Sequence, residues 1–228
     1  MQMTRLTSLF SRATQIYQTE GSTALMRRTL VFLMGGLYRY ETYYLYATNI
    51  LMERNEADFL PSIPTFTMHI VSTNKEAEDL EADGLEFRSY ASNAEKRLEK
   101  GAIAFCFFVG RELVNIAWVA LTEEAFRTFN KPPVKVNFST NEAYSGGLWT
   151  NPKYRGLGFT AYCYFKALEF MRERGKVVSR AAIDVRNLVS QKATGKIGTN
   201  IYAEGRYLRI LWWKSWKEKQ LPQEKPSQ

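Results

Sequence analysis

Cysteine and histidine are scarce in this sequence. Its 228 residues include two cysteines and one histidine. Cys106 and Cys163 lie inside apolar stretches without a Cys-x-x-Cys spacing, which predicts two small buried thiols rather than a disulfide or a ligand pair. His69 is far from both along the chain, so these residues predict no metal site, and we expect a packed or surface role for His69. The scarcity of cysteine favours a reducing, cytoplasmic compartment.

Long hydrophobic runs are also absent. The first apolar run, residues 30–38, is followed by Arg39 and Glu41 and is too short to span a bilayer. The N-terminus does not have the layout of a signal peptide. With 45% hydrophobic and 24% charged residues, the composition is that of a folded globular protein large enough to bury a sizeable core.

Acidic residues become scarce in the last third of the chain. Residues 1–60 contain 6 basic and 5 acidic side chains, residues 61–149 contain 9 and 12, and residues 150–228 contain 16 and 6. The net charge of +8 therefore comes from the last third. Such an asymmetry is typical of a surface for nucleic acid, a membrane or a phosphorylated cofactor, and also of a solvated basic surface without a ligand.

The first part of the chain is aromatic and periodic. Residues 4–56 have apolar side chains at three- and four-residue steps, interrupted by Gly35-Gly36, which predicts two or three helices. Two prolines in the segment 60–64 mark a boundary. We therefore expect three parts: an aromatic-rich helical extension at 1–60, a main domain at 61–219 and a disordered tail at 220–228.

The main domain alternates strand and helix signals. We expect strands at residues 65–71, on either side of Gly110-Arg111 within 102–121, and at 134–150, 179–185, 199–203 and 206–213, the last two separated by a turn at Glu204-Gly205. We expect helices at residues 74–83 with Asn74 as N-cap, at 91–100 after Ser92 or Asn93, at 160–175 and at 187–196.

The run WWKSWK, residues 212–217, mixes indoles with lysines. Single-stranded nucleic acid binds to surfaces of this composition. A terminal strand that packs its indoles on the core and points its lysines outward explains the run equally well.

The stretch NPKYRGLGFT, residues 151–160, stands between a predicted strand and a predicted helix. In that order the N–H groups of the turn and of the first helical turn converge, and the helix dipole favours an anion there. Gly156 and Gly158 leave room for a phosphate, and Arg155 adds a charged donor. A Walker A loop is excluded because no Gly-Lys-Ser/Thr is present, whereas a dinucleotide loop with Ala161 in place of its third glycine stays open on this fragment.

A longer pattern decides between these loops. LWTNPKYRGLGFT is followed by a helix, by IDVRN and by Asn187, Ser190 and Gly198, and the whole resembles the GNAT family of acetyl-CoA-dependent N-acetyltransferases. The loop matches through Pro152, Tyr154, Arg155, Gly156 and Gly158. Thr160 stands where the family usually has glycine or alanine. The resemblance covers residues 65–215, is strong from 146 to 200 and does not extend to residues 1–60.

The resemblance implies an α+β fold: a GNAT-like mixed, mostly antiparallel central sheet with flanking helices, here preceded by the helical extension. It also implies that a splayed strand holds the pantetheine arm of acetyl-CoA and that the glycine turn holds the pyrophosphate. The basic last third would meet the ribose 3′-phosphate. The implied cofactor-binding residues are Leu148, Trp149, Thr150, Arg155, Gly156, Leu157, Gly158, Phe159, Thr160, Asn187 and Ser190.

Catalytic residues are harder to assign. Transfer to an amine needs a base, an N–H group for the oxyanion and a proton donor for the thiolate. The family often has a glutamate on the strand before the loop, which implies Glu142 as the base. The family's acid, a tyrosine seven residues after the asparagine, is replaced by Thr194, so Tyr202 and Tyr144 are the substitute candidates.

The leading hypothesis is therefore an acetyl-CoA-dependent N-acetyltransferase with an unidentified amine acceptor and no metal. The alternative is a catalytically silent GNAT-like module that binds CoA or a partner, and the third is a basic nucleic-acid-binding protein. The N-terminal helices are open to three roles: part of an acceptor pocket, a homodimer contact or a peripheral membrane contact.

Overall fold

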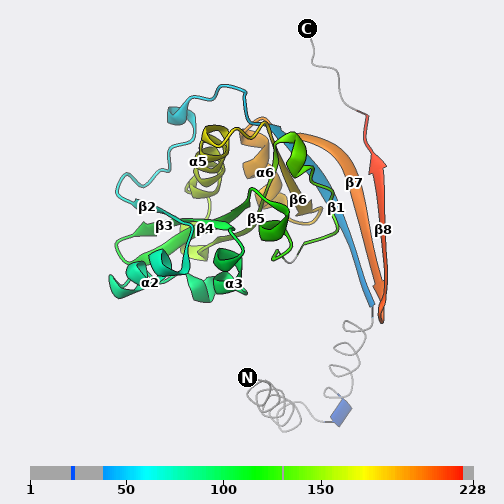
Figure 1. Ribbon diagram of the computed structural model, residues 1–228, viewed down its shortest axis with the longest axis horizontal. Helices are drawn as coiled ribbons and strands as arrows, with labels where there is room; N and C mark the ends of the chain where they lie inside the picture. The colour runs from blue at the N-terminus through cyan, green and yellow to red at the C-terminus, as the bar shows by residue number, and fades with distance from the viewer. Residues whose placement is uncertain (1–21, 24–37, 130, 223–228) are drawn as a thin grey trace. The chain divides into compact units, whose positions relative to one another are not determined.

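The computed structural model describes residues 22–23, 38–129 and 131–222. The chain divides into two compact units: residues 1–41 with 206–217, and residues 42–205 with 218–228. The strands form a sheet in the order β2-β3-β4-β5-β6-β1-β7-β8 (Figure 1). The strands are β1 (Tyr38–Asn49), β2 (Thr67–Val71), β3 (Ile103–Val109), β4 (Glu112–Ala120), β5 (Glu142–Thr150), β6 (Val178–Asp184), β7 (Asn200–Ile210) and β8 (Trp213–Gln220).

Five α-helices accompany the sheet in the described residues. They are α2 (Asn74–Ala82), α3 (Ala94–Glu99), α4 (Glu123–Phe126), α5 (Phe159–Glu173) and α6 (Leu188–Lys196). Figure 1 shows α5 on one face of the sheet and α2 and α3 on the other. The expected mixed, mostly antiparallel sheet with flanking helices is confirmed.

The centre of the sheet follows from two apolar runs. Nearly every residue of β3 and β4 is buried, as expected for strands covered on both faces. Phe105 and Phe107 pack with α5 on one face. Trp118 and Phe108 pack with α2, α3 and α4 on the other. The site described below is therefore built on a rigid core.

Only β5 and β6 pair in parallel, among the pairings that the structure describes. Their register joins Glu142 to Val178 and Tyr144 to Arg180, and pairing ends there. Parallel neighbours need a crossover, which α5 supplies. Strand β6 continues on its other side against β1, from Tyr43 opposite Asp184 to Asn49 opposite Val178.

The expected helical extension is wrong for residues 38–49, which form β1. The aromatic run that suggested a helical period is also a strong strand former, because tyrosine and threonine favour the pleated sheet. Pairing with β6 buries Leu45 and Tyr46, which are 0% and 3% exposed. The sheet thus includes residues before the expected boundary at 61. The rest of the extension, residues 1–21 and 24–37, lies outside the described residues.

Two other local expectations differ from the structure. The N-cap of α2 is Thr73, whose side chain accepts from the N–H of Glu76 in a capping box, and not Asn74. The turn expected at Glu204-Gly205 is absent, because β7 runs through both residues and the chain turns instead at Leu211-Trp212. A single glycine inside a strand is tolerated, so it was a weak turn signal. Part of the expected tail, residues 223–228, lies outside the described residues.

Candidate functional site

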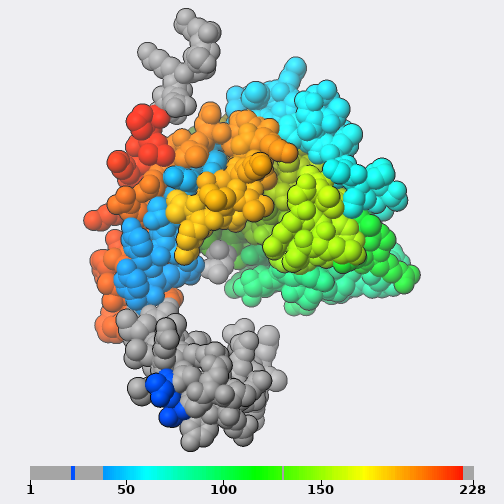
Figure 2. Space-filling view, turned by 180° about the vertical axis from the view of Figure 1, so that it is seen from behind, coloured from blue at the N-terminus to red at the C-terminus, as the bar shows by residue number. Residues whose placement is uncertain are grey.

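A cleft of about 610 Å³ lies where β5, the loop after it, and the starts of α5 and α6 meet. Figure 2 shows the surfaces of α5 (yellow-green) and α6 (amber) next to each other. Of the predicted cofactor-binding residues, all but Leu157 line this cleft: Leu148, Trp149, Thr150, Arg155, Gly156, Gly158, Phe159, Thr160, Asn187 and Ser190. The fold thus brings together residues about 40 positions apart.

The cleft exists because β5 leaves β6. Pairing between them stops at Tyr144, while β5 stays bonded to β4 through Thr150. A register shift lies opposite Ala117, at Gly147, whose φ of 62° belongs to the left-handed region. Beyond Tyr144, the edge of β5 that faces away from β4 is open to an extended ligand, which can bind it as another strand would. The hydroxyls of Ser145 and Ser179, 2.9 Å apart, lie where the two strands separate.

The glycine loop has the shape of a cradle that could hold an anion. Gly156 and Gly158 have φ of 79° and 93°, and a Cβ on Gly156 would meet nothing within 4 Å. The carbonyl of Gly158 accepts from the N–H of Tyr162, so α5 begins there. The N–H groups of residues 159–161 have no acceptor inside the helix, and they lie at the positive end of its dipole. Arg155 adds a cation on the rim.

Contacts behind the loop hold it in place. The N–H of Ser62 donates to the carbonyl of Leu157 at 2.9 Å, and the Leu157 side chain packs against the hydrophobic core. A Cβ on Gly158 would lie 3.2 Å from Cα of Pro61, so glycine is needed there for close packing. The Tyr154 hydroxyl donates to Oε2 of Glu112 at 2.7 Å.

Thr160, the departure from the family pattern, has a structural role. Its hydroxyl is 3.1 Å from that of Thr150, which accepts from Nδ2 of Asn115 at 2.7 Å. Asn115 is completely buried. The threonine therefore ties the first turn of α5 to the end of β5, while its backbone N–H remains one of the cradle's donors.

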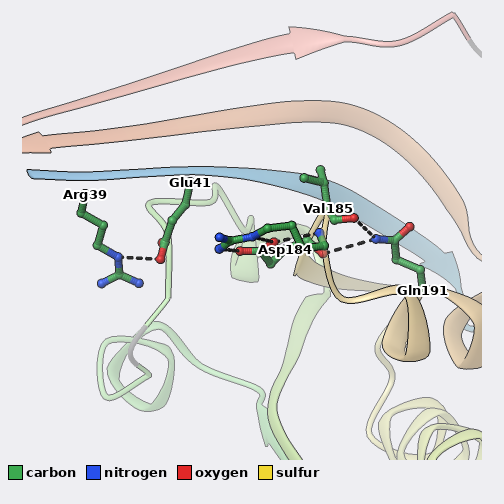
Figure 3. Close-up of polar contacts among 6 residues, drawn as sticks. Arg39, Glu41, Asp184, Val185 and Gln191 are labelled. Atoms are coloured by element: carbon green, nitrogen blue, oxygen red, sulfur yellow. Dashed lines mark hydrogen bonds and ion pairs between the residues drawn. The ribbon is translucent and has the colours of Figure 1, made fainter. Parts of the chain in front are cut away.

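The turn between β6 and α6 is held by side-chain caps. Oδ1 of Asn187 accepts from the N–H of Ser190 at 3.1 Å and caps α6. Nε2 of Gln191 donates to the carbonyls of Asp184 and Val185, at 3.3 and 2.8 Å (Figure 3). These bonds orient the start of α6 along the cleft.

Two cations in the cleft were not predicted individually. Lys192 and Lys196 line it together with Arg155, and no carboxylate is among the lining residues that the structure describes. The sequence could have predicted both lysines, because a spacing of four residues places them on one face of the helix capped by Asn187. The cleft is therefore cationic, as a phosphorylated ligand requires.

The predicted base, Glu142, lies outside this cleft. It is 9% exposed and accepts from Nε of Arg180 at 3.0 Å and from the N–H of Asn137 at 2.8 Å. Burial alone would raise the pKa of this carboxyl, but the bonds from Arg180 and Asn137 hold it below its usual value. A carboxylate held this way is a weak base.

Tyr202 and Tyr144 do not line the cleft either. The ring of Tyr202 is 4.8 Å from Cζ of Arg180, so it joins the ion pair of Glu142, and its burial raises its pKa. Tyr144 is 3% exposed and packs against Phe126 with ring centroids 4.8 Å apart, and burial likewise raises its pKa. Glu142 and Tyr202 thus lie together, and Tyr144 belongs to the core. Their catalytic roles stay predictions.

Thr194 faces a second, very small cavity of about 10 Å³. Hydroxyl groups from three strands and two helices surround it, including those of Ser145, Ser179 and Tyr164. Burial raises the pKa of Tyr164 to about 12. A volume of about 10 Å³ is at the lower limit of the space that one water molecule needs. Tyr164 thus lies beside Thr194, the position where the family usually has its tyrosine acid. The sequence did not indicate Tyr164 as an acid, because its helical spacing predicted a core residue.

The cysteines and the histidine lie apart from the cleft. Cys106 and Cys163 are free and buried, and burial raises the pKa of both thiols. The ring of His69 meets that of Phe108 edge-on at 5.9 Å. Within the described residues there is no group of three or more histidine, cysteine, aspartate or glutamate side chains that could hold a metal ion. No helix in the same part of the chain is long and apolar enough to cross a membrane.

Known proteins resemble this chain in structure but not detectably in sequence. No family model and no curated protein sequence matches the chain. An acetyltransferase from the GNAT family of Colwellia psychrerythraea matches with a TM-score of 0.50 and 15% identity, over 88% of this chain and 71% of that one. The GCN5-related glucosamine N-acetyltransferase region of a fungal multi-domain β-N-acetylglucosaminidase matches with a TM-score of 0.51 and 12% identity, over 83% and 23%.

Several matched structures are longer than this chain. It covers 57% of a Drosophila protein, 66% of a Staphylococcus epidermidis protein of unknown function and 63% of a Novosphingobium aromaticivorans protein. Identities of this order establish a fold rather than an activity. The described chain has the fold of the GNAT N-acetyltransferases.

Proposed function

We propose that the protein is an acetyl-CoA-dependent acyltransferase that acts on an amine. The observation that carries the proposal is the cleft itself. It joins the open edge of β5 to the free N–H groups at the start of α5, and its charged lining residues are all cationic. An extended polar arm that ends in a pyrophosphate fits this combination.

The lining residues fit acetyl-CoA from end to end. The open edge of β5 at Leu148–Thr150 would bind the amides of the pantetheine arm. Since Oδ1 of Asn187 is engaged in the cap, its amide group is the donor that would meet a pantetheine carbonyl. Gly156, Gly158 and the first turn of α5 would hold the pyrophosphate, because a Cβ at Gly156 would occupy the open space of the cradle.

Lys192 and Lys196 would meet the 3′-phosphate. They lie on α6, on the same cleft wall as Asn187, and so extend its cationic side. In this proposal, part of the excess of basic residues in the last third of the chain binds the 3′-phosphate.

Acetyl-CoA supplies the thioester that the amine attacks. An N–H on the open edge of β5 would donate to the carbonyl oxygen and stabilise the oxyanion as it forms. Deprotonation of the amine by Glu142 and protonation of the thiolate by Tyr202 or Tyr144 remain proposals, and these three residues lie outside the cleft lining. The better supported contribution of the chain is binding, orientation and oxyanion stabilisation.

A silent CoA-binding module is the second candidate. Thr194 in the place of the usual acid and the ion-paired state of Glu142 favour it. The two candidates share the cleft and differ in turnover alone.

A thiol-release assay separates the acyltransferase from the silent module. It measures free thiol released from acetyl-CoA in the presence of small amines, amino sugars, peptide N-termini or lysine peptides. We expect release that requires both acetyl-CoA and one class of amine, with the acetylated product seen by mass. Binding without release from any amine would favour the silent module. Oligonucleotide binding that falls steeply with salt, without any acetyl-CoA binding, would contradict both.

A further inference from the structure

The connection between β7 and β8 breaks the usual rules for a hairpin. β7 ends at Ile210 and β8 begins at Trp213, so Leu211 and Trp212 form a two-residue turn. Leu211 adopts φ of 56°, whereas the φ of Trp212 is not positive. A two-residue turn of this kind favours glycine at its first position, because a large side chain is strained in the left-handed region. Strain of this kind is retained mostly where function requires it.

The same turn exposes large hydrophobic side chains. Trp212 is 84% exposed and Trp213 53%, while Ile210 and Leu211 are 44% and 45% exposed. The expectation that the indoles of this run pack on the core is therefore wrong for Trp212 and Trp213. Four consecutive exposed apolar side chains thus gather at one hairpin end, and exposed apolar patches are typical of interaction surfaces. We call residues 210–213 the hairpin tip.

Cations flank the hairpin tip. The segment Arg206–Lys217 contains four basic residues, Arg206, Arg209, Lys214 and Lys217, and no acidic residue. The segment belongs to the compact unit that also includes Arg39. Cζ of Arg39 lies 5.8 Å from the ring centre of Tyr207. Tryptophan beside lysine and arginine is the composition of protein segments at the membrane–water interface.

A membrane surface fits these features better than nucleic acid does. Isoleucine and leucine offer no stacking surface to bases, whereas both gain free energy on entering the acyl region of a bilayer. Single strands are bound along grooves, whereas the exposed side chains here lie at the end of a hairpin. The exposed Lys214 and Lys217 complement the negative charge of anionic lipids.

We propose that the hairpin tip docks on an anionic membrane surface. Ile210 and Leu211 enter the boundary of the acyl chains, the indoles of Trp212 and Trp213 lie at the level of the headgroups, and Lys214 and Lys217 contact lipid phosphates. The proposal is independent of acetyl transfer, because these residues are not among those that line the cleft.

Sedimentation with phosphatidylcholine vesicles, with and without phosphatidylglycerol, tests the proposal on the full chain. Wild type should bind the anionic vesicles and bind less as salt increases. The double variant Leu211→Gly/Trp212→Asn should bind about ten times less, because it loses two apolar side chains that contact the bilayer. Since only the first residue of the turn has a positive φ, glycine followed by asparagine suits it, and this variant should keep or raise the wild-type melting temperature.

Two further variants sharpen the result. Leu51→Asn removes a side chain that is 59% exposed elsewhere and should leave binding unchanged. Lys214→Gln/Lys217→Gln should weaken binding to anionic vesicles only. Wild type that stays in the supernatant, or a Leu211→Gly/Trp212→Asn variant that binds as well as wild type, would overturn the proposal. So would a wild-type dimer that does not bind vesicles and that the same double variant converts to monomer, because this result would assign the tip to a second copy.

Discussion

At the residue scale, Glu142 at the beginning of β5 and Arg180 in β6 form a largely buried ion pair. The side chains are 12% and 23% exposed, and the carboxylate also accepts from the N–H of Asn137. Sequence reasoning selected Glu142 because it was the carboxylate on the strand before the loop. It could not show that Arg180, 38 residues later, would lie against it.

The ion pair predicts a pH-dependent loss of stability. The pKa of Glu142 is lowered in the folded protein, so its ionised form stabilises the fold above the unfolded carboxyl pKa of about 4.3. This contribution is lost as the pH falls through the lowered folded pKa. Glu142→Gln should therefore reduce the free energy of unfolding by about 1–3 kcal/mol at neutral pH.

Urea titrations at several pH values measure this effect. The difference between wild type and Glu142→Gln should shrink below about pH 4. A difference that is the same at neutral and acidic pH would contradict the ion-pair account. If Glu142 is also the base, the variant should lose turnover while it still binds acetyl-CoA.

Lys192 and Lys196 allow a second prediction at this scale. Lys192→Gln/Lys196→Gln should weaken CoA binding about fivefold or more, because two charge-assisted contacts to the 3′-phosphate are lost. Calorimetry with CoA and with 3′-dephospho-CoA measures the two affinities. The affinity for 3′-dephospho-CoA should barely change, and an equal loss for both ligands would place these lysines elsewhere on the ligand.

At the element scale, the bend of β5 at Gly147 opens the cleft. A Cβ there would lie 2.7 Å from Nη1 of Arg97 and 3.1 Å from Cδ1 of Trp118. Arg97 cannot easily move away, because it is 5% exposed and its guanidinium lies over the rings of Trp118 and Phe129. The shape of the strand thus depends on one glycine.

Gly147→Ala and Gly110→Ala make a matched pair for this bend. Their φ values are 62° and 59°, but a Cβ on Gly110 would meet nothing within 4 Å. Both variants carry the left-handed cost, so Gly147→Ala should be less stable than Gly110→Ala by about 1–3 kcal/mol from the added overlap. Thermal unfolding compares them, and equal losses would show that Arg97 and Trp118 give way freely.

Elements with strong local signals were predicted well. The pair β3 and β4, the loop at Gly156 and Gly158, and α5 all follow from apolar runs and turn residues read along the chain. Strand β1 was missed because tyrosine-rich sequence fits a helical period, and its partner β6 pairs with it from Asn49 opposite Val178 to Tyr43 opposite Asp184, far along the chain. Long-range pairing decides between helix and strand here, and the local sequence pattern carries no information on that pairing.

The candidate site divides in the same way. The cradle was predicted because it is continuous in sequence, and Asn187 followed from its spacing to Ser190. The catalytic candidates were harder to place, because the contacts between β5, β6 and β7 decide which side chains face the cleft. The hairpin turn was misplaced because Leu-Trp is an unusual turn pair.

At the scale of the whole molecule, the basic residues of the last third lie in two places. Arg155, Lys192 and Lys196 line the cleft in one compact unit. The segment Arg206–Lys217 belongs to the other unit and includes the hairpin tip. The two proposals therefore assign the basic excess to two different ligands, a nucleotide-bearing thioester and a lipid surface.

Under the proposed function, acetyl-CoA binds in the cleft through the glycine cradle. Calorimetric titration of acetyl-CoA into wild type, Gly156→Asp and Gly156→Asn tests this binding mode. Asp and Asn have the same size and both tolerate the φ of 79° at this position, so they differ in charge alone. We predict that wild type binds, that Asn weakens binding moderately and that Asp weakens it at least about tenfold further, by repulsion of the pyrophosphate. Equal affinities for the Asp and Asn variants, or no binding to wild type, would contradict the account.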